Sequence, residues 1–346
     1  MSHNVNPNIN RIIQNLKRKN YSVEEYLEGI LSGNRNMLSQ AITLLESMLP
    51  QDNEKAEQII KECLPYCGKS QRIGITGVPG VGKSTFIDYF GVKIVEQGHK
   101  LAILAIDPSS GISGGSILGD KTRMETLTAM QEVFIRPSPS QGTLGGVAAK
   151  TRETIVLCEA AGFDTILVET VGVGQSEYAV ASMVDLFMFL IVAGTGDELQ
   201  GIKRGIMEMC DIVVFTKDDG DNKIRTNTAK RQMQSALQLL PPKNSGWMPK
   251  VTSVSSLEYS GFDELNNIID DYFDFIVKNN FLDKNRNQQS VDWFYEQIVN
   301  LLKNTFFSNP QIANLIPNLT IQIKNNEMSP IAAARQLVDL FSSKFK

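Results

Sequence analysis

RIGITGVPGVGKSTF, residues 72–86, is the stretch from which the architecture of this chain follows. Residues 77–84 within it fit the pattern G-x-x-x-x-G-K-[ST] at every fixed position. The apolar residues before the pattern predict a strand, and the spacing after it predicts a helix. We therefore expect a phosphate-binding loop between a strand and a helix. The expected nucleotide-binding residues of this loop are Gly77, Val78, Pro79, Gly80, Val81, Gly82, Lys83, Ser84 and Thr85.

Each residue type in this loop has a chemical reason to be there. The glycines let the backbone turn tightly, so that its N–H groups can approach a polyphosphate. Lys83 supplies a positive charge for the terminal phosphates, and the Ser84 hydroxyl can coordinate Mg²⁺. A helix that begins near Lys83 would direct its positive N-terminal end at the same phosphates. A glycine-rich turn without a ligand is the alternative, but it would leave Lys83 among amides with no anion to balance its charge.

Composition excludes several classes of protein. The 346 residues carry a net charge of −4, which argues against a general nucleic-acid binder. The longest apolar run, residues 186–193, is too short to span a bilayer, and the polar N-terminus lacks the apolar segment of a signal peptide. The four cysteines show no C-x-x-C spacing, so we expect neither disulfides nor a zinc site. We therefore expect a cytoplasmic protein with no nucleic-acid or membrane partner.

The order of the elements predicts an α/β fold. From Arg72 onward, short apolar runs alternate with helical patterns, as in a mostly parallel central sheet flanked by helices. Ligands of such sheets bind at the carboxyl ends of the strands, and each motif below directly follows an expected strand. The expected strands are Arg72–Thr76, Leu101–Ile106, Glu132–Ile135, Thr165–Glu169, Leu186–Val192, Ile212–Thr216 and Lys250–Val254.

Helical extensions are expected on both sides of this nucleotide domain, which we place at residues 69–280. Residues 1–68 read as a helical N-terminal extension, with a capping box from Ser22 to Glu25 and with Pro50 closing one helix. This extension could either stabilise the core or dock a partner. Residues 281–346 also read as helical, after a polar linker at Asn279–Gln289, and would pack on the main domain or pair with a second subunit.

The first motif after the phosphate loop follows the strand that ends at Ile106. Asp107 stands at the strand end, where a carboxylate can bind Mg²⁺ directly or through water. The glycine-rich residues 111–124 contain Asp120 and suit a segment that becomes ordered around the γ-phosphate. A helix-capping or turn role for Asp107 is the alternative.

The second motif is Glu169-Thr-Val-Gly172-Val-Gly-Gln-Ser-Glu177. Glu169 ends an apolar strand, where it would bind the Mg²⁺ shell or orient the attacking water. The backbone N–H of Gly172 would sense the γ-phosphate. The alternative is that Glu169 is a strand-end carboxylate that caps the next turn. Lys83, Glu169 and Asp107 are the expected catalytic residues, and Ser84, Asp107, Asp120 and Glu169 are the expected Mg²⁺ ligands.

The third motif, Thr216-Lys217-Asp218-Asp219, is close to the pattern N-K-x-D that reads guanine. The Asp219 carboxylate would accept from the N1–H and N2–H₂ groups of guanine, and the Lys217 stem would pack on the purine. Thr216 replaces the usual asparagine, which leaves the strictness of GTP over ATP open. After the last strand, the loop Ser255, Ser256 and Leu257 stands where a backbone N–H can donate to guanine O6.

A fourth glycine-rich segment, residues 194–205, follows the strand that ends at Val192. It reads as a mobile loop on the phosphate side of the sheet. A switch function and a plain connection between elements both fit the pattern.

Taken together, these motifs resemble those of the MeaB/ArgK family of P-loop GTPases, to which the methylmalonic aciduria type A protein belongs. The resemblance covers about residues 25–280. It rests on residues 77–85, 107–110, 119–124, 169–177 and 196–203.

The resemblance implies a function that the spacings alone do not. Members of the family are homodimeric G-protein chaperones that gate cofactor loading of adenosylcobalamin-dependent acyl-CoA mutases, mainly methylmalonyl-CoA mutase, and protect them. By this likeness Asp107 and Asp120 belong to the Mg²⁺ site and a first switch region, and Glu169 and Gly172 to a second; Arg123 is a further expected switch residue. Asp197, Gln200 and Lys203 would form an additional switch loop, and the C-terminal segment would be a dimerisation arm.

The sequence therefore favours a chaperone that binds GTP or GDP with Mg²⁺ and hydrolyses GTP. Intrinsic hydrolysis is expected to be slow, because no arginine is assured a place at the γ-phosphate. Arg123 and Arg204 are candidates that a partner would have to position. A transport-associated ATPase or kinase, which is an older label for such sequences, and an interaction module that nucleotide merely stabilises are the alternatives.

Overall fold

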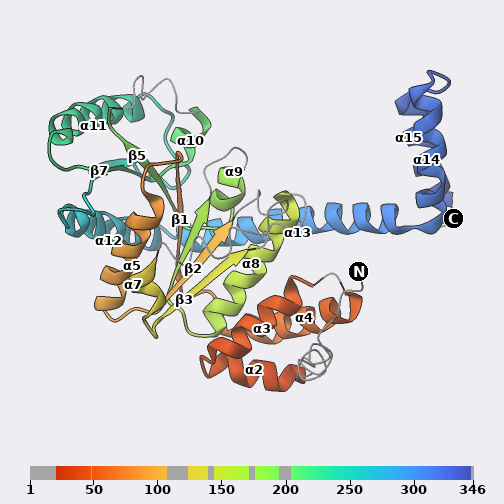
Figure 1. Cartoon of the computed structure of the whole chain (residues 1–346), viewed down its shortest axis with the longest axis horizontal. Coiled ribbons are helices and arrows are strands. Elements are labelled where there is room, and N and C mark those ends of the chain that lie inside the picture. Colours follow the sequence, from red (N-terminus) through yellow and green to blue (C-terminus); the bar gives the residue numbers. More distant parts are fainter. Residues whose placement is uncertain are drawn as a thin grey trace, which may run out of the picture.

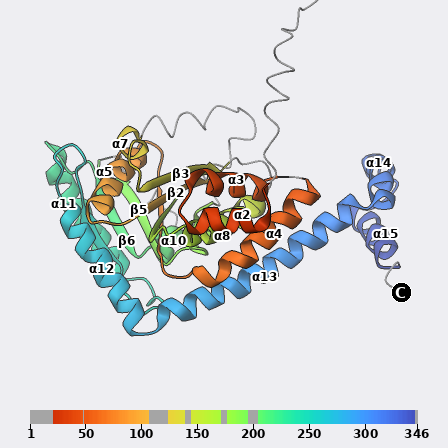
Figure 2. The same cartoon turned by 90° about the horizontal axis from the view of Figure 1, so that it is seen from below.

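The computed structural model describes residues 21–47, 49–106, 124–138, 144–170, 176–194 and 204–343. A central sheet lies between two layers of helices, and the last two helices project well away from this body (Figures 1 and 2). Among the described residues, no helix combines the length and the apolar character that crossing a membrane requires.

The sheet contains seven strands in the order β3-β2-β4-β1-β5-β6-β7, and every neighbouring pair is parallel. The predicted α/β class and all seven predicted strands are confirmed, with ends that move by three residues at most. The phosphate-loop strand β1 lies at the centre, between β4 and β5. The strands are β1 Gln71–Gly77, β2 Leu101–Ile106, β3 Val133–Ser138, β4 Thr165–Thr170, β5 Leu186–Val192, β6 Ile212–Thr216 and β7 Lys250–Ser253.

Both faces of the sheet are covered, which explains why the strands read as continuous apolar runs. On one face, Ile73 and Ile75 of β1 pack into a core with α5 Lys83–Glu96, α7 Glu125–Thr128 and α12 Phe262–Lys278. On the other face, alternate strand residues pack with α8 Leu144–Ala160, α9 Ser176–Ala181 and α11 Asn222–Gln238. A short helix, α10 Arg204–Met209, precedes β6.

The N-terminal extension consists of helices that pack on the outer side of α8 (Figure 2). They are α2 Val23–Leu31, α3 Arg35–Leu45, α4 Pro50–Cys63 and the short 3₁₀ helix η1 Leu64–Tyr66. The predicted capping box is confirmed, since Ser22 and Glu25 bond reciprocally at the start of α2. The expectation that Pro50 closes a helix is wrong: Pro50 is the first residue of α4, where its missing N–H costs nothing and its fixed φ suits the helix.

The C-terminal segment continues directly from α12 into a helix of 28 residues, α13 Phe281–Ser308. The linker predicted at Asn279–Gln289 is therefore wrong over most of its length. Its polar side chains have tertiary partners: Arg286 binds the Asp185 carboxylate, and Gln289 donates to the Val184 carbonyl at 2.8 Å. The chain ends with α14 Pro310–Lys324, which runs through Pro317, and α15 Pro330–Ser342.

Candidate nucleotide-binding site

The phosphate loop joins β1 to α5, as predicted. Gly80 and Gly82 have φ values of +81° and +91°, a region that side chains with a Cβ rarely adopt. Gly77 has no space for a side chain, because an added Cβ would lie 2.6 Å from the Leu190 carbonyl oxygen on β5. Gly82 caps α5, so the free N–H groups of the first helical turn open onto this loop. This backbone has the geometry of an anion-binding loop.

Lys83 is the first residue of α5, and it is partly buried. Its Nζ donates to the Gly77 carbonyl at 2.7 Å, which folds the side chain back across the loop. Burial lowers the pKa of the ammonium, while the Glu169 and Glu177 carboxylates oppose that shift. Ser84 and Thr85 follow in the same helical turn, and the role of Ser84 as a Mg²⁺ ligand stays a prediction.

Glu169 lies next to the phosphate loop. It is 8% exposed near the carboxyl end of β4, in register with Ile75 of β1. The neighbouring Thr170 donates its hydroxyl to the Thr76 hydroxyl at 2.7 Å, in the buried space between the two strands. The second motif and the phosphate loop are therefore linked by a hydrogen bond as well as by the sheet.

Thr216 ties the motif at residues 216–219 to the phosphate loop. Its side chain is buried at the end of β6, and its hydroxyl lies 2.7 Å from the Val81 carbonyl and 3.2 Å from the Ile191 carbonyl. The hydroxyl therefore takes over the structural tie that the asparagine of N-K-x-D would supply. Lys217 follows with φ +57° and donates from Nζ to the Gly80 carbonyl at 2.9 Å. The phosphate loop and residues 216–219, which we call the base loop, are thus joined by hydrogen bonds.

Asp219 is positioned by the loop after β7. Its Oδ2 accepts from the Ser255 hydroxyl at 2.7 Å, and Ser255 itself is fully buried. The Ser255 N–H donates to the Ser260 carbonyl, so it is not the donor for guanine O6. No hydrogen bond among the described residues uses the N–H of Ser256 or Leu257, which leaves these two as the candidate donors.

Several predicted site residues lie outside the described residues, and their roles stay predictions. They are Asp107, Asp120, Arg123, Gly172, Asp197, Gln200 and Lys203.

Two acidic residues near the site were missed at the sequence level. Glu177, in the first turn of α9, is 4% exposed and acts on Lys83; its Oε2 is buried with no hydrogen-bond partner among the described residues. Glu258, in the loop that follows β7, forms an ion pair with Lys223 of α11, the helix that follows the base loop. Glu177 stands within the second motif and could have been singled out there, whereas nothing in the sequence pairs Glu258 with Lys223.

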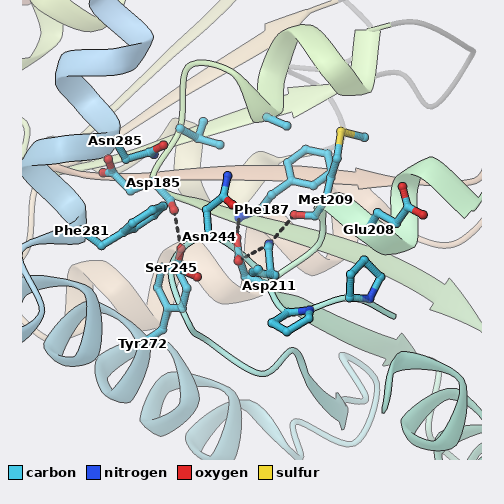
Figure 3. A pocket seen from close by; sticks show the side chains of 15 residues that line it. Asp185, Phe187, Glu208, Met209, Asp211, Asn244, Ser245, Tyr272, Phe281 and Asn285 are labelled. Carbon is cyan, nitrogen blue, oxygen red and sulfur yellow. Dashed lines mark hydrogen bonds and ion pairs between the residues drawn. The ribbon is translucent and has the colours of Figure 1, made fainter. Parts of the chain in front are cut away.

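A cavity of about 330 Å³ lies at the opposite edge of the sheet, where β5 and β6 begin (Figure 3). Its charged groups are already engaged: the Lys243 ammonium donates to the Asp211 carboxylate and to the Met209 carbonyl at 2.7 Å. The Tyr272 hydroxyl donates to the Asp185 carbonyl at 2.7 Å. These contacts join the sheet to the segment where α12 is followed by α13, on the side of the sheet away from the phosphate loop.

Comparisons with known proteins agree with this geometry. The family model described as "Methylmalonyl Co-A mutase-associated GTPase MeaB" matches residues 38–311. "GTPase ArgK" of Escherichia coli (strain K12) is 44% identical over 324 residues, which cover 94% of this chain and 98% of that protein. "Methylmalonic aciduria type A homolog, mitochondrial" of Mus musculus is 42% identical over 332 residues, 93% of this chain and 80% of that protein. The solved structure described as LAO/AO transport system kinase has 38% sequence identity and a TM-score of 0.73, over 92% of this chain and 97% of its own.

Proposed function

The chain belongs to the MeaB family of GTPases, as its motifs predicted, and we propose that it is a GTP-dependent chaperone of an adenosylcobalamin-dependent acyl-CoA mutase of the methylmalonyl-CoA mutase type. In this role it gates cofactor loading and protects the mutase. The partner class rests on the name of the family and on relatives such as the mouse methylmalonic aciduria type A homolog.

One observation carries the nucleotide part of the proposal: the phosphate loop and the base loop are joined through Thr216 and Lys217. In this proposal Lys83 and the loop amides hold the β- and γ-phosphates, and Asp219 accepts from guanine. The Lys217 stem supports the purine. A change at the γ-phosphate would reach the base loop through the same hydrogen bonds.

The residues present fit a Mg²⁺ ion. This ion usually takes only one or two protein ligands and keeps phosphate oxygens and waters as the others. Ser84 at the start of α5 and the buried Glu169 near the end of β4 offer a hydroxyl and a carboxylate at the same edge of the sheet. Asp107 and Asp120 are the further proposed ligands. When bound, Mg²⁺ would neutralise charge on the phosphates, and Glu169 would orient water.

We also propose that the C-terminal segment, residues 281–346, is a dimerisation arm. Helix α13 leaves the body (Figure 2). Large apolar side chains on it are exposed. Exposed large apolar side chains along one helix support a contact with another chain. The exposed residues are Val291, Phe294, Tyr295, Val299, Leu301, Leu302 and Phe307. We further propose domain boundaries near residues 68 and 280 and a cytoplasmic location.

A pull-down from the native cell tests the partner class. The full chain is immobilised and loaded with a non-hydrolysable GTP analogue, with GDP in a parallel sample. The proposal expects an acyl-CoA mutase to be recovered, in amounts that depend on the nucleotide. Failure to recover a mutase with either nucleotide would overturn the chaperone role. Equal recovery by wild type and by Lys83→Ala would favour an interaction module in place of a nucleotide-driven chaperone.

A further inference from the structure

The two loops that surround Asp219 are joined by contacts that the guanine-reading motif does not require. One loop, residues 217–221, follows β6 and leads into α11, which begins at Asn222, and the other, residues 255–260, follows β7. Both contain residues with positive φ, including Gly220 at +47° and Tyr259 at +56°. Turns of this kind hold one conformation only when neighbouring contacts fix them.

Glu258 supplies such contacts from three of its atoms. Its backbone N–H donates to the Ser255 hydroxyl oxygen at 3.0 Å, and that hydroxyl donates to Asp219. Its carboxylate accepts from Lys223 Nζ at 2.6 Å and from the Gly220 N–H at 3.5 Å. Because Gly220 directly follows Asp219, Glu258 contacts the Asp219 loop both through the backbone next to Asp219 and through the Ser255 hydroxyl that bonds the Asp219 carboxylate.

The outer side of the same loop is fixed to the phosphate-loop helix. The ring centroids of Tyr259 and of Tyr89 on α5 lie 5.1 Å apart, and the ring centroids of Tyr89 and Phe262 lie 4.4 Å apart. The loop is thus held between α5 on one side and the Lys223 ammonium on the other. The hydrogen bond with Lys223 also lowers the pKa of Glu258, as a formed ion pair should.

We infer that Glu258 is a positioning residue for base selection. It holds the loop that contains Asp219 and the loop that follows β7 together through Lys223 and the Gly220 amide. The inference rests on Asp219 being the guanine-reading carboxylate. Both side chains of the pair are substantially exposed, 51% for Lys223 and 38% for Glu258. An exposed pair of this kind has a modest effect, so we expect about a two- to fivefold change in guanine nucleotide affinity.

Titration of GDP and ADP into the full chain, at low and at high salt, tests the inference. The variants are Glu258→Gln, Lys223→Met and the two combined. Asp274→Asn is the matched control, because Asp274 forms an exposed ion pair with Lys278 at 3.0 Å on α12. Each single variant should weaken GDP about two- to fivefold at low salt, with ADP unchanged. The combined variant should lose no more than either single variant, and high salt should reduce the differences.

Two results would overturn the role of Glu258. One is a GDP affinity in all three variants that does not differ from that of the control Asp274→Asn. The other is an equal loss of GDP and ADP, which would indicate general loosening of the fold and no effect on the base. If the wild-type chain itself bound GDP no better than ADP, the assignment of Asp219 as the guanine-reading residue would be overturned, and the role of Glu258 would fall with it.

Discussion

Replacing Thr216 by valine should separate the structural tie to the phosphate loop from base recognition. Valine keeps the shape of threonine and removes the hydroxyl. In the wild-type chain this hydroxyl lies between the Val81 and Ile191 carbonyls in a site where Thr216 is only 5% exposed. Loss of a buried hydrogen bond that leaves an acceptor unsatisfied costs about 1–3 kcal/mol. We expect the free energy of unfolding to fall by that amount.

The same change should weaken every nucleotide that uses the phosphate loop. Because Val81 is within that loop and the hydroxyl is engaged by the Val81 and Ile191 carbonyls, GDP and ADP affinities should fall together. Urea unfolding of the nucleotide-free chain and titration with both nucleotides measure the two effects. Thr252→Val is the control, since Thr252 is fully buried on β7 and its hydroxyl has no hydrogen-bond partner among the described residues. That variant should be as stable as the wild type, or more stable.

The reasoning about Thr216 would be refuted by Thr216→Val behaving like Thr252→Val in both assays. A selective loss of GDP with unchanged ADP would also contradict it, because it would mean that the Thr216 hydroxyl acts on the base.

Two further predictions concern buried ion pairs away from the nucleotide. Arg286→Met removes the partner of the buried Asp185 and should cost about 3–5 kcal/mol in urea unfolding, with faster proteolysis at the start of α13; wild-type stability would contradict the anchoring role of Arg286. Burial raises the pKa of Glu159, but bonds from Arg72 and Ser70 outweigh this and hold it below the ordinary value. Its stabilising effect is therefore present above the unfolded-state pKa of about 4.3 and lost as the pH falls below it. Glu159→Gln should be less stable than wild type at pH 7, with the difference shrinking below about pH 4; a difference that is independent of pH would contradict this.

The sheet was predictable because its signals are local. Most strands are short, largely apolar runs, and β2, β4 and β5 are buried on both faces; the phosphate loop carries a fixed pattern between a strand and a helix. Thr216 illustrates the limit of such reading. The sequence shows that asparagine is replaced, but only the fold shows that the threonine hydroxyl reaches the Val81 carbonyl, 135 positions away in the chain.

The errors arose where tertiary contacts decide the local structure. Residues 279–289 are polar and show no apolar periodicity, yet most of them are helical because Arg286 reaches the carbonyls of Gly68 and Ser70 and the Asp185 carboxylate. Glu258 and Lys223 meet because β6 and β7 are neighbours, which no spacing in the sequence specifies. Proline ends helices and also begins them, so the pattern around Pro50 did not distinguish the two outcomes.

The central claim, that this chain reads guanine through Asp219, is tested most directly by the nucleotide preference of Asp219→Asn. In the proposed complex the carboxylate would accept two hydrogen bonds from guanine, so its loss should cost at least about 3 kcal/mol, roughly a hundredfold in GTP affinity. ATP affinity should stay the same, and xanthosine triphosphate, which offers a carbonyl where guanine has an amino group, should bind better than GTP. Calorimetric titration of wild type and variant with the three nucleotides makes the comparison. An unchanged preference for GTP over ATP in the variant would contradict the account.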